Sequence, residues 1–298
     1  MPRRFSSIVS TRHRPPSSRV WRRFPVADVQ QPPADFLAQV DAATIVPGQI
    51  ALWYIGGAGF IVRTPSTTLY IDPFCGPSID ENWVRGLAPP FDPARIRVCD
   101  GILSTHEHLD HCDPVALVPM LTSTRATLFG PATSIEMAAG FGWPANRLHA
   151  LTWGDSTTVG DIKITTIKSV DPMAKGCNGY VMESQGIIFV NMGDSLWYDD
   201  IGKQMAPWKI DAICLSVALN PPGETLYMSE IDAVRIARDV GAKVLIPHHW
   251  DLWQRVALDP RRIATVAPWY APDTIVRPTR FCQRISLIRA GEAIAIGL

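Results

Sequence analysis

The sequence predicts an α/β fold, built as one large domain over residues 28–298. Short apolar stretches rich in β-branched residues alternate with stretches of helical periodicity, which is typical of layered α/β proteins. Several of the apolar stretches also end in a histidine or an aspartate. No internal repeat or interdomain linker divides the chain, and folds of this class often reach this length as a single unit.

The chain begins with a basic arm, residues 1–27, that differs from the rest in composition. The arm holds seven arginines and no acidic residue, which leaves 21 basic and 28 acidic residues in the remainder. With its serines and prolines, this composition predicts a flexible, solvated terminus. Contact with a nucleic acid or an anionic membrane, or a role as an organelle transit peptide, stays open. We do not expect a secretory signal, because no apolar stretch follows the arginines.

The overall composition is that of a globular protein in water. The chain is 47% hydrophobic and 19% charged, and no apolar stretch is long enough for a transmembrane helix. Its six cysteines include no Cys-x-x-Cys pair, so the sequence indicates neither a thiolate zinc site nor a redox dithiol. This cysteine pattern fits a reducing compartment, and we expect the protein in the cytoplasm.

The first predicted elements are three strands. Residues 50–62 are predicted to form two strands joined by a glycine turn, and a third strand is predicted at 68–72. Residues 85–98 contain several prolines and are predicted to be a loop. Ile102 and Leu103 then form a short buried strand, which leads directly into a histidine-rich motif.

A helix is predicted directly after that motif. Asp113 can cap its N-terminus, and Pro114 occupies the first helical position, where proline is favoured. Segments 127–130, 161–170 and 187–192 are predicted as strands from their β-branched content or their alternation.

The clearest helical pattern covers residues 230–240. Ser229 can cap this helix, its apolar residues lie on one face, and Gly241 ends it. A further short apolar strand follows at 243–247. Strands and helices therefore alternate along most of the chain, as the α/β class requires.

The histidine-rich motif, Thr105–His111, contains four metal-binding side chains within six residues. Alternate residues of an extended turn point the same way, so His106 and His108 can hold one ion while Asp110 and His111 turn towards a second. Ligands packed this densely rarely serve packing alone. The motif therefore predicts a centre with two metal ions.

Three distant segments offer further ligands, again at the ends of strands. The predicted strand at 161–170 is followed by Asp171, the one at 187–192 by Asp194, and the one at 243–247 by His248 and His249. Each of these aspartates alone could be a turn former. Together with the motif, however, these residues supply the ligands that two ions need, and Asp194 would bridge the metals opposite a shared hydroxide.

Asp72 follows an apolar strand and is flanked by apolar residues. A carboxylate in such surroundings needs a polar partner, so we predict that Asp72 orients a ligand histidine by a hydrogen bond. A turn-forming aspartate before Pro73 is the alternative. Cys112 and Cys177 also lie near the site segments and are expected to be ordinary buried residues.

With these residues identified, the sequence resembles the metallo-β-lactamase superfamily, whose His-x-His-x-Asp-His motif stands here at His106–His111. It looks most similar to the branch that contains L-ascorbate-6-phosphate lactonases. The similar segments occur along the chain in the same order as in the family. They are residues 51–56, 70–72, 100–111, 193–195, 220–221 and 242–253. They extend over roughly residues 48–260, which chance matches of a short motif would not produce.

The resemblance implies an αββα sandwich, in which two mixed β-sheets are flanked by helices and the metals lie at one edge. It implies that the first metal is bound by His106, His108 and Asp171. The second metal would be bound by Asp110, His111 and His249. Asp194 would be a carboxylate ligand that bridges the two metals. Asp171 replaces the usual third histidine of the first site. His248 would then contact a ligand or line the pocket, and the reversed assignment of His248 and His249 stays open.

The implied cofactors are two divalent metal ions. The additional carboxylate makes the site harder, so manganese is expected beside zinc, and iron is also compatible. Two departures concern the substrate. The segment 172–178 is shorter than in the lactonases, and their C-terminal extension is absent. We therefore do not expect ascorbate 6-phosphate itself as the substrate.

The predicted function is hydrolysis of a small lactone, cyclic amide or ester by the hydroxide that bridges the metals, with Asp110 handling the proton. A phosphodiesterase acting on a phospholipid or nucleic acid is one alternative, supported only by the basic arm. A non-catalytic, metal-stabilised binding protein is the other, and the complete ligand set argues against it.

We expect a small-molecule substrate and no nucleic-acid partner, while assembly as a homo-oligomer stays open. Substrate-binding residues are not predicted; the residues that flank the ligand segments could line a pocket or belong to the core, namely Asn220, Tyr227, Trp250 and Trp253.

Overall fold

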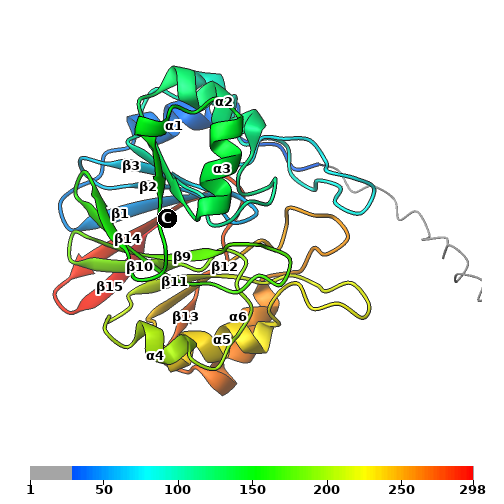
Figure 1. Ribbon diagram of the computed structural model, residues 1–298. Coiled ribbons are helices and arrows are strands. Elements are labelled where there is room, and N and C mark those ends of the chain that lie inside the picture. The colour runs from blue at the N-terminus through cyan, green and yellow to red at the C-terminus, as the bar shows by residue number, and fades with distance from the viewer. Residues whose placement is uncertain (1–28, 298) are drawn as a thin grey trace, which may run out of the picture.

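A computed structural model of the protein describes residues 29–297. Two β-sheets lie face to face in the middle, and a layer of helices covers the outer face of each (Figure 1). The predicted αββα sandwich is therefore confirmed. The basic arm, residues 1–27, lies outside the described residues. Within the described residues, no helix is long and apolar enough to cross a membrane.

The first sheet has eight strands, in the order β15-β14-β1-β2-β3-β4-β5-β6. Their bounds are β1 Gln49–Gly56, β2 Gly59–Arg63, β3 Thr68–Ile71, β4 Gly101–Leu103, β5 Thr127–Gly130, β6 Leu148–Ala150, β14 Arg284–Ala290 and β15 Ala293–Gly297. Neighbours pair antiparallel from β15 to β3 and parallel from β3 to β6. The sheet is therefore mixed.

The second sheet has seven strands, in the order β13-β12-β11-β10-β9-β8-β7. Their bounds are β7 Ser156–Val159, β8 Ile162–Lys168, β9 Asn178–Ser184, β10 Ile187–Asn191, β11 Ala212–Ser216, β12 Val244–His248 and β13 Ile275–Val276. Neighbours pair antiparallel from β7 to β10 and parallel from β10 to β13. This sheet is mixed as well.

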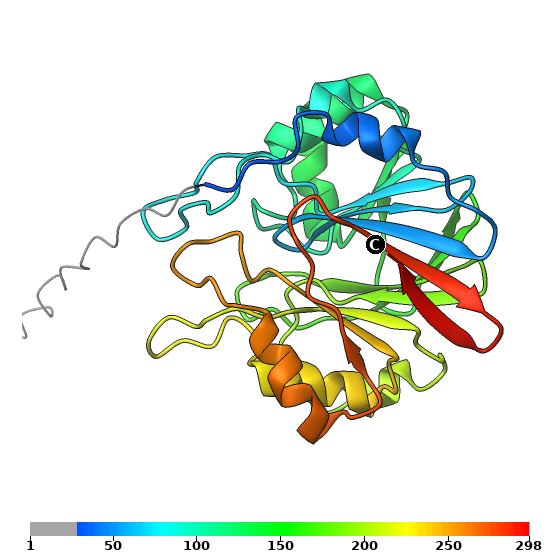
Figure 2. The ribbon, with the colours of Figure 1, turned by 180° about the vertical axis from the view of Figure 1, so that it is seen from behind.

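Helices cover the outer face of each sheet, as both views show (Figures 1 and 2). Those on the first sheet are α1 Phe36–Ala42, α2 Pro114–Ser123 and α3 Ala132–Gly140. Those on the second are α4 Ile201–Met205, α5 Glu230–Asp239 and α6 Arg261–Tyr270. Two short 3-10 turns complete the helical segments, η1 Pro93–Arg95 and η2 Ala145–Arg147.

The strands in the middle of the sandwich are buried on both faces, as β1 illustrates. Trp53 belongs to the core beneath α1 and α2, whereas Leu52 and Tyr54 belong to the core between the two sheets. Successive strand residues point to opposite faces, so a strand covered on both sides must be apolar at nearly every position. This explains the long apolar run that begins at Ile50.

The predicted elements agree with those of the structure. The glycine turn lies between β1 and β2, and the predicted strands at 127–130 and 187–192 correspond to β5 and β10. Asp113 caps α2 by accepting hydrogen bonds from the backbone N–H groups of the next turn, and Ser229 caps α5 through a capping box with Asp232. The predicted loop 85–98 differs in one detail, because Asp92 caps the 3-10 turn η1 within it.

Segments that follow five strands carry the predicted site residues. Two of these strands, β3 and β4, are parallel neighbours in the first sheet, and β8, β10 and β12 belong to the second. The polar segments that follow them meet at one edge of the sandwich. Each sheet therefore contributes part of the same site.

Candidate metal centre

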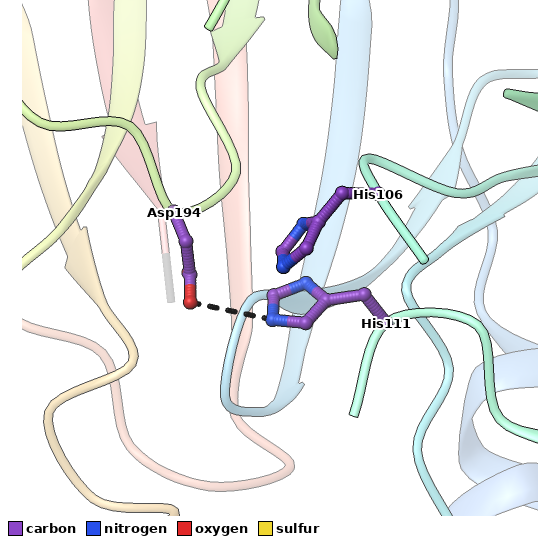
Figure 3. Close-up of side chains that lie close together, drawn as sticks. All are labelled: His106, His111 and Asp194. Atoms are coloured by element: carbon purple, nitrogen blue, oxygen red, sulfur yellow. Dashed lines mark ion pairs between the residues drawn. The ribbon is translucent and has the colours of Figure 1, made fainter. Parts of the chain in front are cut away.

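The motif Thr105–His111 leaves β4 and folds back on itself. The backbone N–H of Asn178 donates to the Thr105 carbonyl at 2.8 Å, which fixes the start of the motif against β9. The backbone N–H of His111 donates to the His108 carbonyl at 2.9 Å, which closes a turn. This turn brings the rings of His106 and His111 to a centroid distance of 3.9 Å, and both rings point towards Asp194 (Figure 3).

The first group of metal-binding atoms comes from His106, His108 and Asp171. Asp171 Oδ2 lies 3.2 Å from His106 Nε2 and 3.3 Å from His108 Nδ1. The two histidine nitrogens are 2.9 Å apart. The aspartate that replaces a third histidine is thus placed with the motif, although more than 60 residues separate them in the sequence.

The second group comes from Asp110, His111 and His249. Asp110 Oδ2 lies 3.5 Å from His111 Nε2 and 3.3 Å from His249 Nε2. His249 has a positive φ of 64°. A residue other than glycine adopts this sparsely populated conformation only where its surroundings impose it. The backbone N–H of His249 donates to the Gly57 carbonyl at 2.7 Å, and this bond holds the turn that aims the ring.

Asp194 lies between the two groups. Its Oδ2 atom is 3.4 Å from His111 Nε2 and 3.3 Å from His249 Nε2. It also forms a potential metal-binding set with His106 and His111, whose ligand atoms all lie within 4.8 Å of one another. Asp194 thus contacts the second group directly and has a ligand atom within 4.8 Å of that of His106 in the first group, a placement that suits a bridging ligand.

The donor atoms fit divalent cations by their spacing. Ligand atoms about 2.1 Å from a tetrahedral cation lie about 3.4 Å from one another. The separations run from 2.9 to 3.3 Å within the first group, and Asp110 Oδ2 lies 3.3 and 3.5 Å from the two histidines of the second. In addition, Asp194 Oδ1 and His111 Nε2 are buried without a hydrogen-bond partner among the described residues. Buried polar atoms normally have partners, and a bound cation would supply one here.

The electrostatics of the group favour the charged carboxylates. Burial alone would raise the pKa of Asp110 and Asp194, but the adjacent imidazoles outweigh it, and the pKa of each carboxyl is lowered. For Asp171, the hydrogen bond to His106 outweighs burial in the same way and lowers the pKa. The three acids are therefore ionised at neutral pH, which is the form that binds a cation.

Asp72 contacts the group from behind. Its Oδ2 atom lies 2.8 Å from His111 Nδ1 and accepts a hydrogen bond from the Thr105 hydroxyl at 2.6 Å, whereas its Oδ1 atom accepts one from the Thr105 backbone N–H at 2.7 Å. A bond at Nδ1 leaves Nε2 of His111 directed at Asp110 and Asp194. The geometry thus matches the orienting role predicted for Asp72.

His248 and His249 point to different places. His249 belongs to the second group, whereas the ring of His248 packs edge-on against Phe60 at a centroid distance of 6.0 Å. Both ring nitrogens of His248 are buried and have no hydrogen-bond partner among the described residues. Burial lowers the pKa of this imidazole to about 3. Two roles were predicted for His248, contact with a ligand residue or a place in the pocket wall. In the structure its ring forms no hydrogen bond to a ligand candidate. It also does not line the pocket described below.

Two residues make contacts with the site that the sequence did not predict. Glu107, inside the motif, accepts hydrogen bonds from the backbone N–H groups of Lys175 and Gly176 and thereby holds the segment after Asp171 beside the motif. The indole N–H of Trp253 donates to Asp110 Oδ2 at 3.2 Å. The position of Glu107 between two histidines of the motif indicated in the sequence that its side chain could contact the site. No sequence pattern near Trp253 indicates its contact with Asp110.

A pocket of about 420 Å³ opens over the group and reaches His108, Asp110, Asp171 and Asp194. Of the four pocket candidates in the sequence, Tyr227 and Trp253 line it. The other two do not contribute to its wall. Asn220 accepts hydrogen bonds from the backbone N–H groups of residues 226 and 227, and Trp250 stacks on Tyr54 at 6.3 Å. The group is thus accessible to a small molecule.

Comparisons with known proteins agree with this arrangement. The family model described as "Beta-lactamase superfamily domain" matches residues 67–250. A curated relative from Salmonella heidelberg, "Probable L-ascorbate-6-phosphate lactonase UlaG", is 27% identical, with 76% of each chain covered. The predicted resemblance to the lactonase-containing branch is thereby confirmed.

Solved structures share the fold at low sequence identity. Igni18, a metallo hydrolase of Ignicoccus hospitalis, superimposes with a TM-score of 0.66 at 14% identity, covering 81% of this chain and 100% of its own. The metallo-beta-lactamase fold protein YhfI of Bacillus subtilis gives 0.61 at 16% identity, covering 80% and 99%. With the family model spanning more than half of the residues, the chain belongs to the beta-lactamase superfamily, as a hydrolase of the metallo-β-lactamase fold.

Proposed function

We propose that this hydrolase uses two divalent metal ions to open a small lactone, cyclic amide or ester. The observation that carries the proposal is the pair of three-residue donor groups beneath an open pocket, with Asp194 in contact with the second group and in a potential metal-binding set with His106 of the first. The ligands would be those of the two groups together with Asp194. Zinc and manganese suit the mixed imidazole and carboxylate donors, and iron is also compatible.

Divalent cations bound there would lower the pKa of water towards neutrality and stabilise the negative charge that develops on an attacked carbonyl. The residues around them would position and exchange protons. Asp110 reaches the pocket and accepts the Trp253 N–H through Oδ2, so its carboxylate is held in place to take up a proton and deliver it to the leaving oxygen or nitrogen. Asp72 would keep His111 in the tautomer that presents Nε2 to the centre.

The relatives, the cysteines and the pocket volume bear on the substrate type, the cellular compartment and the partner. The lactonase-named relatives favour a cyclic ester among the three substrate types. All six cysteines are free, buried thiols, which favours a reducing compartment such as the cytoplasm. A small molecule, and no nucleic acid, is the partner that the 420 Å³ pocket suits.

The test is hydrolysis of a panel of lactones, cyclic amides and esters, with metal content measured on the same samples. Chelation should abolish turnover, and Mn²⁺ or Zn²⁺ should restore it. His108→Ala should lose metal from the first group and activity together. His149→Ala is the matched control, because this exposed histidine on β6 lies outside both groups and should retain both properties. Full activity of a metal-free His108→Ala protein would refute the proposal.

A further inference from the structure

The wall of the pocket over the metal centre is apolar and carries no positive charge. Apart from the metal-binding candidates and Tyr227, it is formed by six apolar or aromatic side chains and two acids. The six are Ile79, Trp83, Leu109, Met173, Leu226 and Trp253. The acids are Asp80 and Glu224, and no lysine or arginine of the described residues lines the pocket. A phosphate group is normally bound by arginine, lysine or clustered N–H donors, and this wall offers it no cationic side chain.

Arg85 lies next to the pocket segments, but it is buried and each of its three guanidinium nitrogens already donates a hydrogen bond. Its guanidinium lies over the ring of Phe74, 4.3 Å from the centroid. Its N–H groups donate to the backbone carbonyls of Gly76, Leu87 and Ala88. A buried guanidinium that already binds three carbonyls is not available to an anionic substrate. Its role is to hold the loop that carries Ile79 and Trp83.

The mouth of the pocket exposes large apolar side chains from separate loops. Met173 is 66% exposed, Leu109 42% and Ile79 40%. The loops that carry Ile79, Leu226 and Trp253 project on the same side of the sandwich, cyan, yellow and orange in Figures 1 and 2. Apolar side chains gathered around a hollow indicate a surface that an apolar ligand covers.

The aromatic part of the wall is held in place beside the reacting centre. The rings of Trp83 and Trp253 meet edge to face at 5.8 Å, and Phe74 packs on Trp253 at 5.7 Å. The indole N–H of Trp253 is bound to Asp110. An apolar substituent that packs on these rings would therefore be positioned relative to Asp110.

We propose that the substrate is an uncharged acyl compound with an apolar alkyl or aryl substituent and no phosphate. The substituent would lie along Trp83, Leu226 and Met173, while the carbonyl faces the metal centre. This inference rests on the proposed hydrolysis and narrows it. It also separates the chain from the relatives whose name specifies a phosphorylated lactone.

The first test compares lactones that differ only in their substituent. In an alkyl series, kcat/KM should rise about fourfold per added methylene until the pocket is filled. A lactone of the same length with a terminal phosphate should be turned over at least about tenfold less efficiently. Leu226→Ala should reduce the gain in kcat/KM per methylene, because it removes part of the apolar wall. Equal or better turnover of the phosphate-bearing lactone by the wild type would overturn the inference.

The second test changes the charge at the pocket. Glu224→Lys should raise kcat/KM for the phosphate-bearing lactone by about tenfold or more, because it replaces an exposed acid of the wall by a cation. Glu136→Lys makes the same charge change on the exposed face of α3, outside the pocket, and is the matched control. If both variants change phosphate turnover equally, net charge rather than the wall governs selectivity, and the inference is wrong.

A binding measurement distinguishes failure of this inference from failure of the proposed function. 2-Alkyl tetrahydrofurans resemble the lactones but cannot be hydrolysed, and calorimetry should show tighter binding as the alkyl chain grows. If the ethers bind in this order but no lactone, amide or ester is cleaved, the proposed function fails and the pocket assignment stands. If the lactones are cleaved with no dependence on the chain, the proposed function stands and this inference falls. Absence of both binding and cleavage would overturn both.

Discussion

At the scale of single residues, the candidate centre depends on side chains that are not themselves ligand candidates. Asp72 is fully buried and has a positive φ of 42°, a backbone conformation that aspartate and asparagine tolerate better than most residues. It binds His111 and Thr105 at once. The position therefore combines an unusual backbone with a carboxylate that orients an imidazole.

We expect Asp72→Asn to weaken metal binding about 10- to 100-fold, the usual cost of losing a partner behind a ligand histidine. The amide keeps the size and the backbone preference of the aspartate but cannot accept the bonds from both His111 and Thr105. Competition with a chromogenic chelator measures the affinity. The far-UV spectrum should be unchanged, and unaltered affinity in a folded variant would show that Asp72 only shapes the turn.

The neighbouring histidines give a second prediction. His249→Asn should lose about one metal equivalent, because it removes a donor from the second group while tolerating the positive φ. His248→Leu should retain both ions and full stability, since it removes two buried nitrogens that have no partners among the described residues. Metal analysis by mass spectrometry measures both. Loss of metal from His248→Leu alone would reverse the assignment.

The limits of the sequence at this scale follow from distance along the chain. The motif predicted its own cluster because four donors within six residues must lie close together. Asp171, Asp194 and His249 could be proposed because each follows a predicted strand, and the structure brings them to the motif. The bond from Trp253 to Asp110 spans 143 residues and no local pattern accompanies it, so only the fold reveals it.

At the scale of elements, one aspartate joins three turns at the ends of strands. Asp161, between β7 and β8, accepts hydrogen bonds from Thr64 and Thr67 of the β2–β3 turn and from Gln185 of the β9–β10 turn. These bonds connect the two sheets. Burial would raise the pKa of Asp161, but the hydrogen bonds outweigh it and lower the pKa to about 2.

Because the pKa of Asp161 is lower in the folded state, its ionised carboxylate stabilises the fold at pH values above the unfolded pKa of about 4. This stabilisation is lost as the pH falls towards 2. Asp161→Asn should therefore lower the free energy of unfolding by about 1 kcal/mol at pH 6, a value discounted for the partial exposure of the carboxylate. The difference from the wild type should shrink between about pH 4 and pH 2. Urea unfolding of chelated protein measures it. A difference that stays constant over this range would contradict the assignment.

The predicted elements were those with a strong local signal. The caps at Asp113 and Ser229, and the glycine turn between β1 and β2, are encoded within a few residues. The C-terminal hairpin β14–β15 was not predicted, and β14 pairs with β1 across more than 230 residues. Helix α6 was missed as well, and Pro268 inside it interrupts the usual helical pattern.

At the scale of the whole molecule, the candidate centre spans the two sheets. Asp72 and the motif follow strands of the first sheet, whereas Asp171, Asp194 and His249 follow strands of the second. Bound ions would therefore connect the two halves of the sandwich at the edge where the pocket opens. Each potential metal-binding set combines one carboxylate with two imidazoles, so the ions would balance the charge of three buried or half-buried acids.

Metal removal should consequently destabilise the whole protein and not only the site. Free metal at about 1,000 times its Kd stabilises a one-site protein by about 4 kcal/mol, which corresponds to a Tm increase of roughly 8 °C for a chain of this size. We expect at least this fall in Tm when the ions are chelated, and recovery when Mn²⁺ or Zn²⁺ is returned. Asp194→Asn should show a smaller difference between chelated and metal-loaded protein, because this side chain contacts the second donor group and shares a potential metal-binding set with His106 of the first. An unchanged Tm after complete removal of the ions would mean that packing between the sheets alone holds the two halves together.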